Sequence, residues 1–160
     1  MDFEQRLQKA IERGQKVSSE KSAAQAQNAL SEDELKSLHS RYRLQLSEHI
    51  EECLRKTADH FPGFRFNSLV SEGWGASIHR DDVARGIGGR PSNFYSRLEI
   101  VVRPYSPVQI VELVGKATIR NKEIFNRSHF QRLTEVDIDT LMGLVDAWVL
   151  EFAELYAAQR

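Results

Sequence analysis

The segment HRDDVARGIGGRPSN, residues 79–93, concentrates side chains that could do chemistry: an imidazole, two adjacent carboxylates and three guanidinium groups around a glycine cluster. Backbone amides of successive glycines can form a concave anion-binding nest, and Arg85 and Arg90 flank the glycines of 86–89. The pattern therefore favours an anionic ligand or partner, if the segment binds anything. Its content of glycine, proline and serine favours a plainer interpretation, a mobile loop of about 14 residues between two strands.

Known catalytic and metal-binding motifs do not match this chain. The glycine cluster lacks the lysine and the serine or threonine that complete a phosphate-binding P-loop. The loop and strand residues that could ligate a metal fit no typical ligand spacing; they are His79, Asp81, Asp82 and His129. Cys53 is the only cysteine, and its place on an apolar helix face suggests a small buried hydrophobe. The sequence thus predicts no catalytic residue, no cofactor and no bound metal.

Charge is distributed unevenly along the chain, although the net charge is only −1. Residues 64–134 carry 11 basic and 6 acidic side chains, a sum of +5, whereas residues 135–160 carry 1 basic and 6 acidic, a sum of −5. Nine of the 11 basic residues are arginine, whose planar fork of donors suits carboxylates and phosphates. The predicted anion-binding or partner-binding residues are His79, Arg80, Arg85, Arg90, Arg97, Arg103 and Arg120.

Aromatic residues are interleaved with these arginines, which raises a second interpretation. They are Phe94, Tyr95, Tyr105, Phe125 and Phe130. Basic side chains neutralise phosphates and aromatic rings stack on bases, so a sheet that exposes both kinds could bind single-stranded nucleic acid. The acids of the last helix offer a structural alternative, because they could pair with sheet arginines across the surface.

Two long helices are expected on either side of a strand-rich segment. Ser31 and Glu34 form a capping box that begins a helix over 31–61, and Pro62-Gly63 ends it. A wide apolar stripe predicts a helix over 134–158 with Thr134 as its cap, and Gly143 within it is expected to permit close packing. Residues 1–30 form an arm, either flexible or a short amphipathic helix.

Between the helices the apolar period changes to two, which is typical of strands. Leu98, Ile100 and Val102 alternate with Arg97, Glu99 and Val101. Short connections between such segments make the sheet antiparallel. The prediction is an α+β fold in a single domain over 31–160. Four to five antiparallel strands are covered on one face by the two long helices.

These features predict a non-catalytic protein-interaction module of the adaptor or chaperone-like kind, which can include self-association as a homodimer. Its arginine-rich sheet and loop would face an anionic partner. The alternative is a nucleic-acid-binding protein that uses the arginine and aromatic side chains, and the third is a small enzyme acting on an anionic ligand. A single cysteine and the absence of a long apolar run favour a cytoplasmic protein without a membrane partner.

Overall fold

The computed structural model describes residues 2–30, 32–85 and 91–159. The elements in chain order are α1 (Phe3–Leu30), α2 (Glu32–His60), β1 (Arg65–Leu69), β2 (Trp74–Arg85), β3 (Pro91–Val102), β4 (Ile110–Ile119), β5 (Lys122–Arg132), a 3-10 turn (Leu133–Glu135) and α3 (Ile138–Ala158). The chain divides into two compact units, residues 1–37 and 38–160. Among the described residues, no helix is both long and apolar enough to cross a bilayer.

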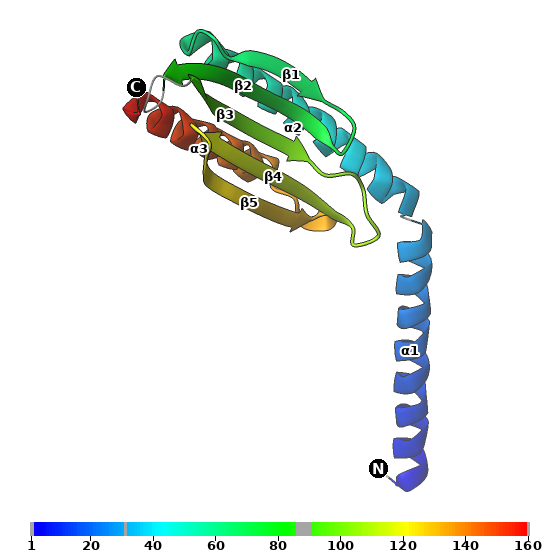
Figure 1. Ribbon diagram of the computed structural model, residues 1–160. Coiled ribbons are helices and arrows are strands. Elements are labelled where there is room, and N and C mark those ends of the chain that lie inside the picture. Colours follow the sequence, from blue (N-terminus) through cyan, green and yellow to red (C-terminus); the bar gives the residue numbers. More distant parts are fainter. Residues whose placement is uncertain (1, 31, 86–90, 160) are drawn as a thin grey trace. The chain divides into compact units, whose positions relative to one another are not determined.

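The five strands form one antiparallel sheet in the order β1-β2-β3-β4-β5, so every strand pairs with its neighbour in sequence. Helices α2 and α3 lie against one face of the sheet (Figure 1), and within the described part of residues 38–160 the opposite face carries no helix. Side-chain contacts divide the covered face between the helices: Arg55 of α2 lies over Phe66 of β1, whereas Trp148 of α3 meets Phe125 of β5. The α+β fold expected from the sequence is confirmed.

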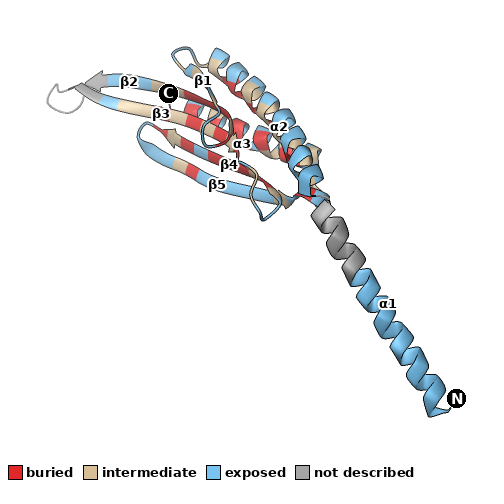
Figure 2. Ribbon diagram, turned by 90° about the vertical axis from the view of Figure 1, so that its right-hand side faces the viewer, coloured by how far each residue is buried: buried red, intermediate tan, exposed pale blue. Residues whose placement is uncertain are grey.

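The core lies between the sheet and the two helices (Figure 2). The sheet forms one side of the core, because successive side chains of a strand point to opposite faces and every second one faces the helices. The buried apolar side chains of the strands are Ala76, Ile78, Leu98, Ile100, Val102, Val111, Leu113, Ala117, Ile119 and Phe125. Helical spacing supplies the other side, from Leu46, Ile50 and Leu54 of α2 and from Leu141, Val145, Trp148, Val149, Phe152 and Tyr156 of α3.

One core position is polar and incompletely paired. His39 of α2 is only 3% exposed, its ring lies edge-on to Tyr105 at 5.7 Å, and its Nε2 has no hydrogen-bond partner. Burial is the main cause that lowers the pKa of His39; a hydrogen bond to the backbone of Arg103 opposes the effect, and the charge of Arg43 adds to it.

Close packing between α3 and the sheet depends on a glycine in β4. A Cβ atom at Gly115 would lie 2.6 Å from Cε3 of Trp148, so the indole ring occupies the space that a side chain would need. At Gly143 in α3, in contrast, an added Cβ would have nothing within 4 Å. The expectation that Gly143 allows close helix packing is therefore wrong, because this glycine lies on the exposed side of the helix.

The segment 79–93 is mostly strand, which corrects the expectation of a loop of that length. β2 continues to Arg85 and β3 begins at Pro91, and their residues pair in register along the whole shared length. β1 pairs only as far as His79 and β4 only as far as Arg97, so residues 80–85 and 91–96 form a two-stranded ribbon. The glycines of the proposed anion nest and Arg90 lie outside the described residues.

The helix ends differ slightly from those expected. Asp137, and not Thr134, is the N-cap of α3, and its carboxylate accepts hydrogen bonds from the backbone N–H and the hydroxyl of Thr140. Thr134 instead lies in the preceding 3-10 turn. Ser31, the expected cap of the first long helix, lies outside the described residues.

In the unit formed by residues 1–37, α1 continues to Leu30, so the arm is helical along its described length. Every residue from 2 to 21 is exposed, including the large apolar side chains Phe3, Leu7, Ile11 and Val17. Their stripe runs beside a basic one, formed by Arg6, Lys9, Arg13 and Lys16 at spacings of three and four. The arm thus has the amphipathic pattern expected from the sequence.

Candidate functional site

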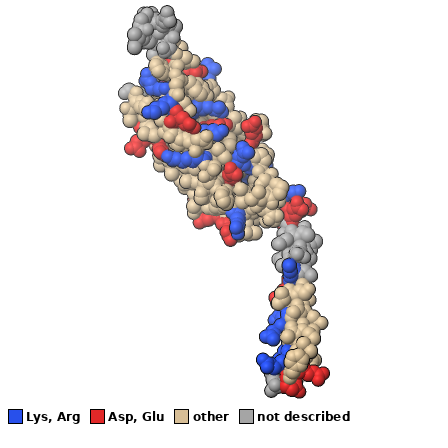
Figure 3. Space-filling view, turned by 60° about the horizontal axis from the view of Figure 1, so that its bottom comes forward, with Lys and Arg blue, Asp and Glu red and all other residues tan. Residues whose placement is uncertain are grey.

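The sheet face opposite α2 and α3, which we call the open face, carries the side chains that alternate with the buried ones along each strand, and many of them are polar. Leu98 and Ile100 point into the core, so Arg97 and Glu99 point the other way. The same logic places polar and basic side chains of four strands on the open face: Arg65, Asn67, His79, Arg97, Glu99, Glu112 and Lys116, with Arg103 just beyond β3. Lys and Arg side chains are mixed with Asp and Glu over the sheet domain (Figure 3).

Three of the predicted site residues lie on the open face. Arg97 makes a 3.5 Å contact with Glu99 on its own strand. His79 Nδ1 accepts a hydrogen bond from the side-chain amide N–H of Asn67 in β1 at 3.3 Å. Arg103 is exposed and makes no ion pair among the described residues within 4.0 Å, and its backbone N–H bonds to the carbonyl oxygen of Glu112.

The remaining predicted site residues are not gathered on that face. Arg80 donates to Asp82 and to the carbonyl oxygen of Pro62, each at 2.6 Å, which fixes the end of α2 to β2. The guanidinium of Arg120 lies 4.8 Å from the ring centre of Phe94, next to the β4–β5 turn. Arg85 ends β2, and Arg90 lies outside the described residues. Among the described side chains, His79, Arg97 and Arg103 thus lie on the open face, whereas Arg80 and Arg120 make their contacts elsewhere.

The interleaved aromatic residues are divided between the two faces of the sheet. Phe125 is buried at 5% exposure beside Trp148, and Phe94 lies on the covered side of β3 beneath Arg120. On the open face, Phe130 is 60% exposed, and Tyr95 is half-buried next to His79. The open face thus offers stacking surfaces at separate places rather than a continuous aromatic platform.

Two hollows mark the open face and its edge. One, of about 100 Å³, has a lining of mixed apolar and charged side chains, and its residues are Leu69, Ser71, Glu72, Gly73, Glu99, Val101, Arg103, Val114 and Lys116. The other, of about 210 Å³, is polar and is lined by Gly63, Arg65, His79, Arg80 and Asp81. Both are smaller than the roughly 300–1,000 Å³ of typical small-molecule pockets. A larger hollow, of about 600 Å³, runs between side chains of α1 alone.

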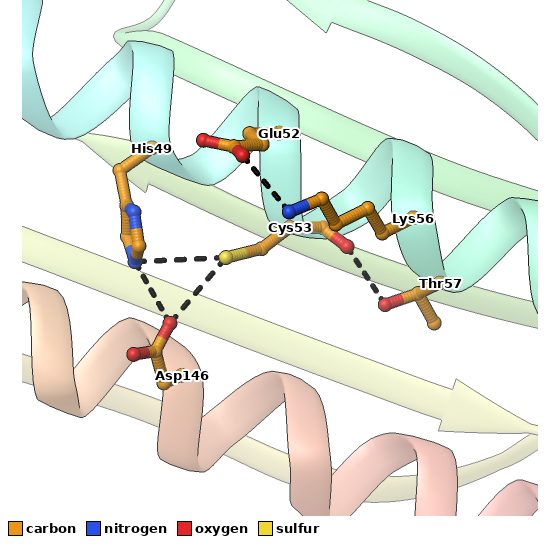
Figure 4. Close-up of polar contacts among 6 residues, drawn as sticks. All are labelled: His49, Glu52, Cys53, Lys56, Thr57 and Asp146. Atoms are coloured by element: carbon orange, nitrogen blue, oxygen red, sulfur yellow. Dashed lines mark hydrogen bonds and ion pairs between the residues drawn. The ribbon is translucent and has the colours of Figure 1, made fainter.

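A second cluster of reactive groups lies between the two helices that cover the sheet (Figure 4). His49 and Cys53 are four residues apart on α2, so they share one face of that helix, and Asp146 projects toward them from α3. His49 Nε2 lies 2.7 Å from Asp146 Oδ1 and 3.5 Å from Cys53 Sγ. Cys53 Sγ lies 3.4 Å from the same Asp146 oxygen. Three different ligand atoms thus converge on one point.

The convergence corrects the expectation for Cys53. Leu54 takes the fully buried position on α2, and Cys53 beside it is only half-buried. Burial, followed by the hydrogen bond to the Asp146 carboxylate, raises the pKa of the thiol to about 12. A thiol of this kind is a weak nucleophile at neutral pH, since the thiolate is the reactive form.

The arrangement also differs from a nucleophile–base relay. In such a relay, one imidazole nitrogen contacts the nucleophile and the other contacts the carboxylate. In this protein, both contacts are made by Nε2 of His49. The ring therefore cannot pass a proton from Cys53 through to Asp146, and the geometry favours ligation or a hydrogen-bonded link between helices.

Sequence reasoning missed this cluster. A histidine and a cysteine four residues apart on a helix are a usable signal, because that spacing brings two ligand atoms together. Asp146 follows Cys53 by 93 residues, and no local pattern indicates that α3 lies beside α2 at this point.

No protein-family model, curated protein or solved structure matches this chain.

Proposed function

We propose that the protein is a non-catalytic protein-interaction module whose open face binds an acidic segment of a partner protein. The observation that carries this proposal is the 100 Å³ hollow on the open face. Two cations, Arg103 and Lys116, line it together with apolar side chains such as Val101 and Val114, and Glu72 and Glu99 line it as well. An extended segment with alternating apolar and acidic side chains would place one kind against the valines and the other beside the two cations.

The second hollow supports the same kind of ligand. Arg65 and His79 line it at one end of β1, and Leu69 lines the first hollow at the other end. Arg65 and Leu69 are four positions apart along β1, which corresponds to about 13 Å. An extended peptide of roughly five residues covers that distance, so both hollows can be occupied by one short acidic segment.

An acidic protein segment fits this face better than a nucleic acid does. Binding of single strands depends on successive bases stacking on aromatic rings, and Phe94 and Phe125 face the helix layer instead. Glu99 and Glu112 also lie among the cations of the open face. Their repulsion acts on every phosphate of a continuous backbone, whereas a segment with spaced carboxylates can keep its charges beside the cations. Nucleic-acid binding through the same arginines is the alternative that the experiment below addresses.

Fluorescence anisotropy tests the proposal with two labelled probes, a peptide of alternating glutamate and leucine and a single-stranded oligonucleotide. We expect the peptide to bind, and Arg103→Glu combined with Lys116→Glu to weaken its binding by about tenfold or more, since like charges would then face each other. Arg13→Glu with Lys16→Glu is the matched control. It changes the net charge equally, on the exposed basic stripe of α1.

Each other outcome has a distinct meaning. Tighter binding of the oligonucleotide, falling steeply with salt, would replace the proposal with the nucleic-acid alternative. A loss of peptide binding in the α1 variant alone would move the anion-binding surface from the sheet to the arm. Absence of binding by both probes at low salt would contradict an anion-binding role for the open face.

A further inference from the structure

We propose that His49, Cys53 and Asp146 form a zinc-binding site that links α2 to α3. The site is separate from the open face, because its three side chains belong to the helices on the opposite side of the sheet. It offers one nitrogen, one sulfur and one oxygen, which lie within 4.8 Å of one another. All three atoms are common ligands of Zn²⁺ in proteins.

The spacing of the three atoms agrees with tetrahedral coordination. Zinc–ligand distances of roughly 2.0–2.3 Å separate two ligand atoms of a tetrahedral site by about 3.4–3.6 Å. The sulfur lies 3.5 Å from His49 Nε2 and 3.4 Å from Asp146 Oδ1. Only the His49–Asp146 distance, 2.7 Å, is shorter. It is a hydrogen-bond distance, and a cation in the place of the shared proton would widen it.

Exposure leaves room for a fourth ligand and for this adjustment. The side chain of Asp146 is 50% exposed and that of His49 is 24% exposed. The Asp146 carboxylate can therefore shift outward to widen the distance, and solvent can reach the ion. Three protein ligands with water at an open position are typical of accessible zinc sites.

The mixed ligand set points to zinc rather than to a hard cation. Calcium and magnesium take oxygen ligands almost entirely, and this site supplies only one oxygen among three ligand atoms. The neighbouring carboxylate of Glu52 is paired with Lys56 at 2.9 Å on the exposed side of α2.

Co²⁺ serves as the spectroscopic probe, because a thiolate bound to Co²⁺ gives a near-ultraviolet charge-transfer band and tetrahedral Co²⁺ absorbs strongly in the visible range. The full chain is titrated with Co²⁺ under reducing conditions, and Zn²⁺ is then added as a competitor. We expect one Co²⁺ per chain, both absorption features, and their loss when Zn²⁺ displaces the probe.

Substitution of each of the three residues tests whether its side chain binds the metal ion. Cys53→Ser should abolish the charge-transfer band, and His49→Gln and Asp146→Asn should each weaken binding by about tenfold or more, because each removes one of three ligands. His129→Gln is the matched control, since this exposed histidine lies on β5. Far-ultraviolet circular dichroism verifies that each variant is folded; the substituted positions are half-buried or exposed, so the core is untouched.

The result that would overturn the proposal is a wild-type titration without a charge-transfer band, or a band that persists in both His49→Gln and Asp146→Asn. Such a result would leave the three residues as a hydrogen-bonded link between the helices. Failure here is distinguishable from failure of the proposed function, because Cys53→Ser should leave binding of the acidic peptide to the open face unchanged.

Discussion

His39 makes stability depend on pH through a single buried ring. Its folded-state pKa is lowered, mainly by burial, so the unfolded chain binds a proton more readily than the folded chain does. Stability therefore rises with pH over this range. The contribution of neutral His39 is fully present above the unfolded value of 6.5 and is lost as pH falls through the lower folded value.

Urea unfolding at about pH 7.5 and at about pH 5 measures this effect. We expect the wild type to lose stability at the lower pH, and His39→Gln to lose less, since glutamine does not titrate. Exposed His129 provides the control, and His129→Gln should follow the wild type. A pH dependence that is identical in His39→Gln and the wild type would mean that carboxylates dominate and that His39 contributes little.

At the residue scale, the sequence predicts which charged side chains lie on the surface, but not which of them lie close to one another. Strand alternation alone places Arg97 opposite Leu98 and Ile100, and the structure agrees. The same charge pattern groups Arg80 with Arg97, yet Arg80 is bound to Asp82 and Pro62. Whether an arginine is free or paired depends on acids and carbonyl groups brought near by folding, and a charge count does not contain that information.

At the scale of elements, the contact between β4 and α3 makes a second prediction, which compares two glycines. Gly115→Ala should destabilise the protein by about 1–3 kcal/mol, because the added methyl group would clash with Trp148. Gly143→Ala should instead stabilise it by about 0.5–1 kcal/mol, because alanine favours the helix and the methyl group meets open space.

Chemical denaturation of both variants gives the comparison directly. Both variants replace glycine by alanine, so a difference between their changes in stability reflects the surroundings of the two positions. A stabilised Gly115→Ala would show that the Trp148 ring can move aside without cost. A destabilised Gly143→Ala would show that this face of α3 is covered, for example by another copy of the chain.

Most elements can be predicted from the apolar period, and the exceptions have identifiable causes. The period of two predicts the strand around Leu98, and Pro62-Gly63 correctly ends α2. The segment 79–93 resembles a loop in sequence because its arginines, aspartates and glycines have no apolar alternation. The backbone pairs there nonetheless, because the backbone hydrogen bonds of a hairpin need few buried side chains. Ser96 is buried in this ribbon, whereas Asp81 and Val83 are exposed. Asn121 braces the ribbon by accepting from the N–H of Tyr95 and donating to the carbonyl oxygen of Asn93.

At the scale of the whole molecule, all buried side chains among the residues whose burial is described belong to the unit of residues 38–160. Residues 2–21 of α1 are all exposed. Deletion of residues 1–30 should therefore shift the melting temperature by less than about 2 °C, which corresponds to under roughly 0.5 kcal/mol. Differential scanning calorimetry of both chains, at two protein concentrations, makes the measurement.

Light scattering on the same two samples addresses self-association. A lower melting temperature after deletion, with a change from dimer to monomer, would mean that the apolar stripe of α1 is buried between copies. A lower melting temperature without a change in mass would contradict the division of the chain into two independent units. The sequence could suggest the stripe, but not its partner, because Phe3, Leu7 and Ile11 fit any complementary apolar surface.

The ribbon of residues 80–85 and 91–96 gives the protein a gradient of local stability. Up to His79 and Arg97, β2 and β3 have further strands beside them, and breaking their backbone hydrogen bonds disturbs the core. Beyond that point the strand pairing involves β2 and β3 alone, with Asn121 of the β4–β5 turn as a brace at Asn93 and Tyr95, and an isolated hairpin is marginally stable. The inner halves of β2 and β3 therefore open only with global unfolding. Their outer halves open locally, in small steps that start at the end of the ribbon.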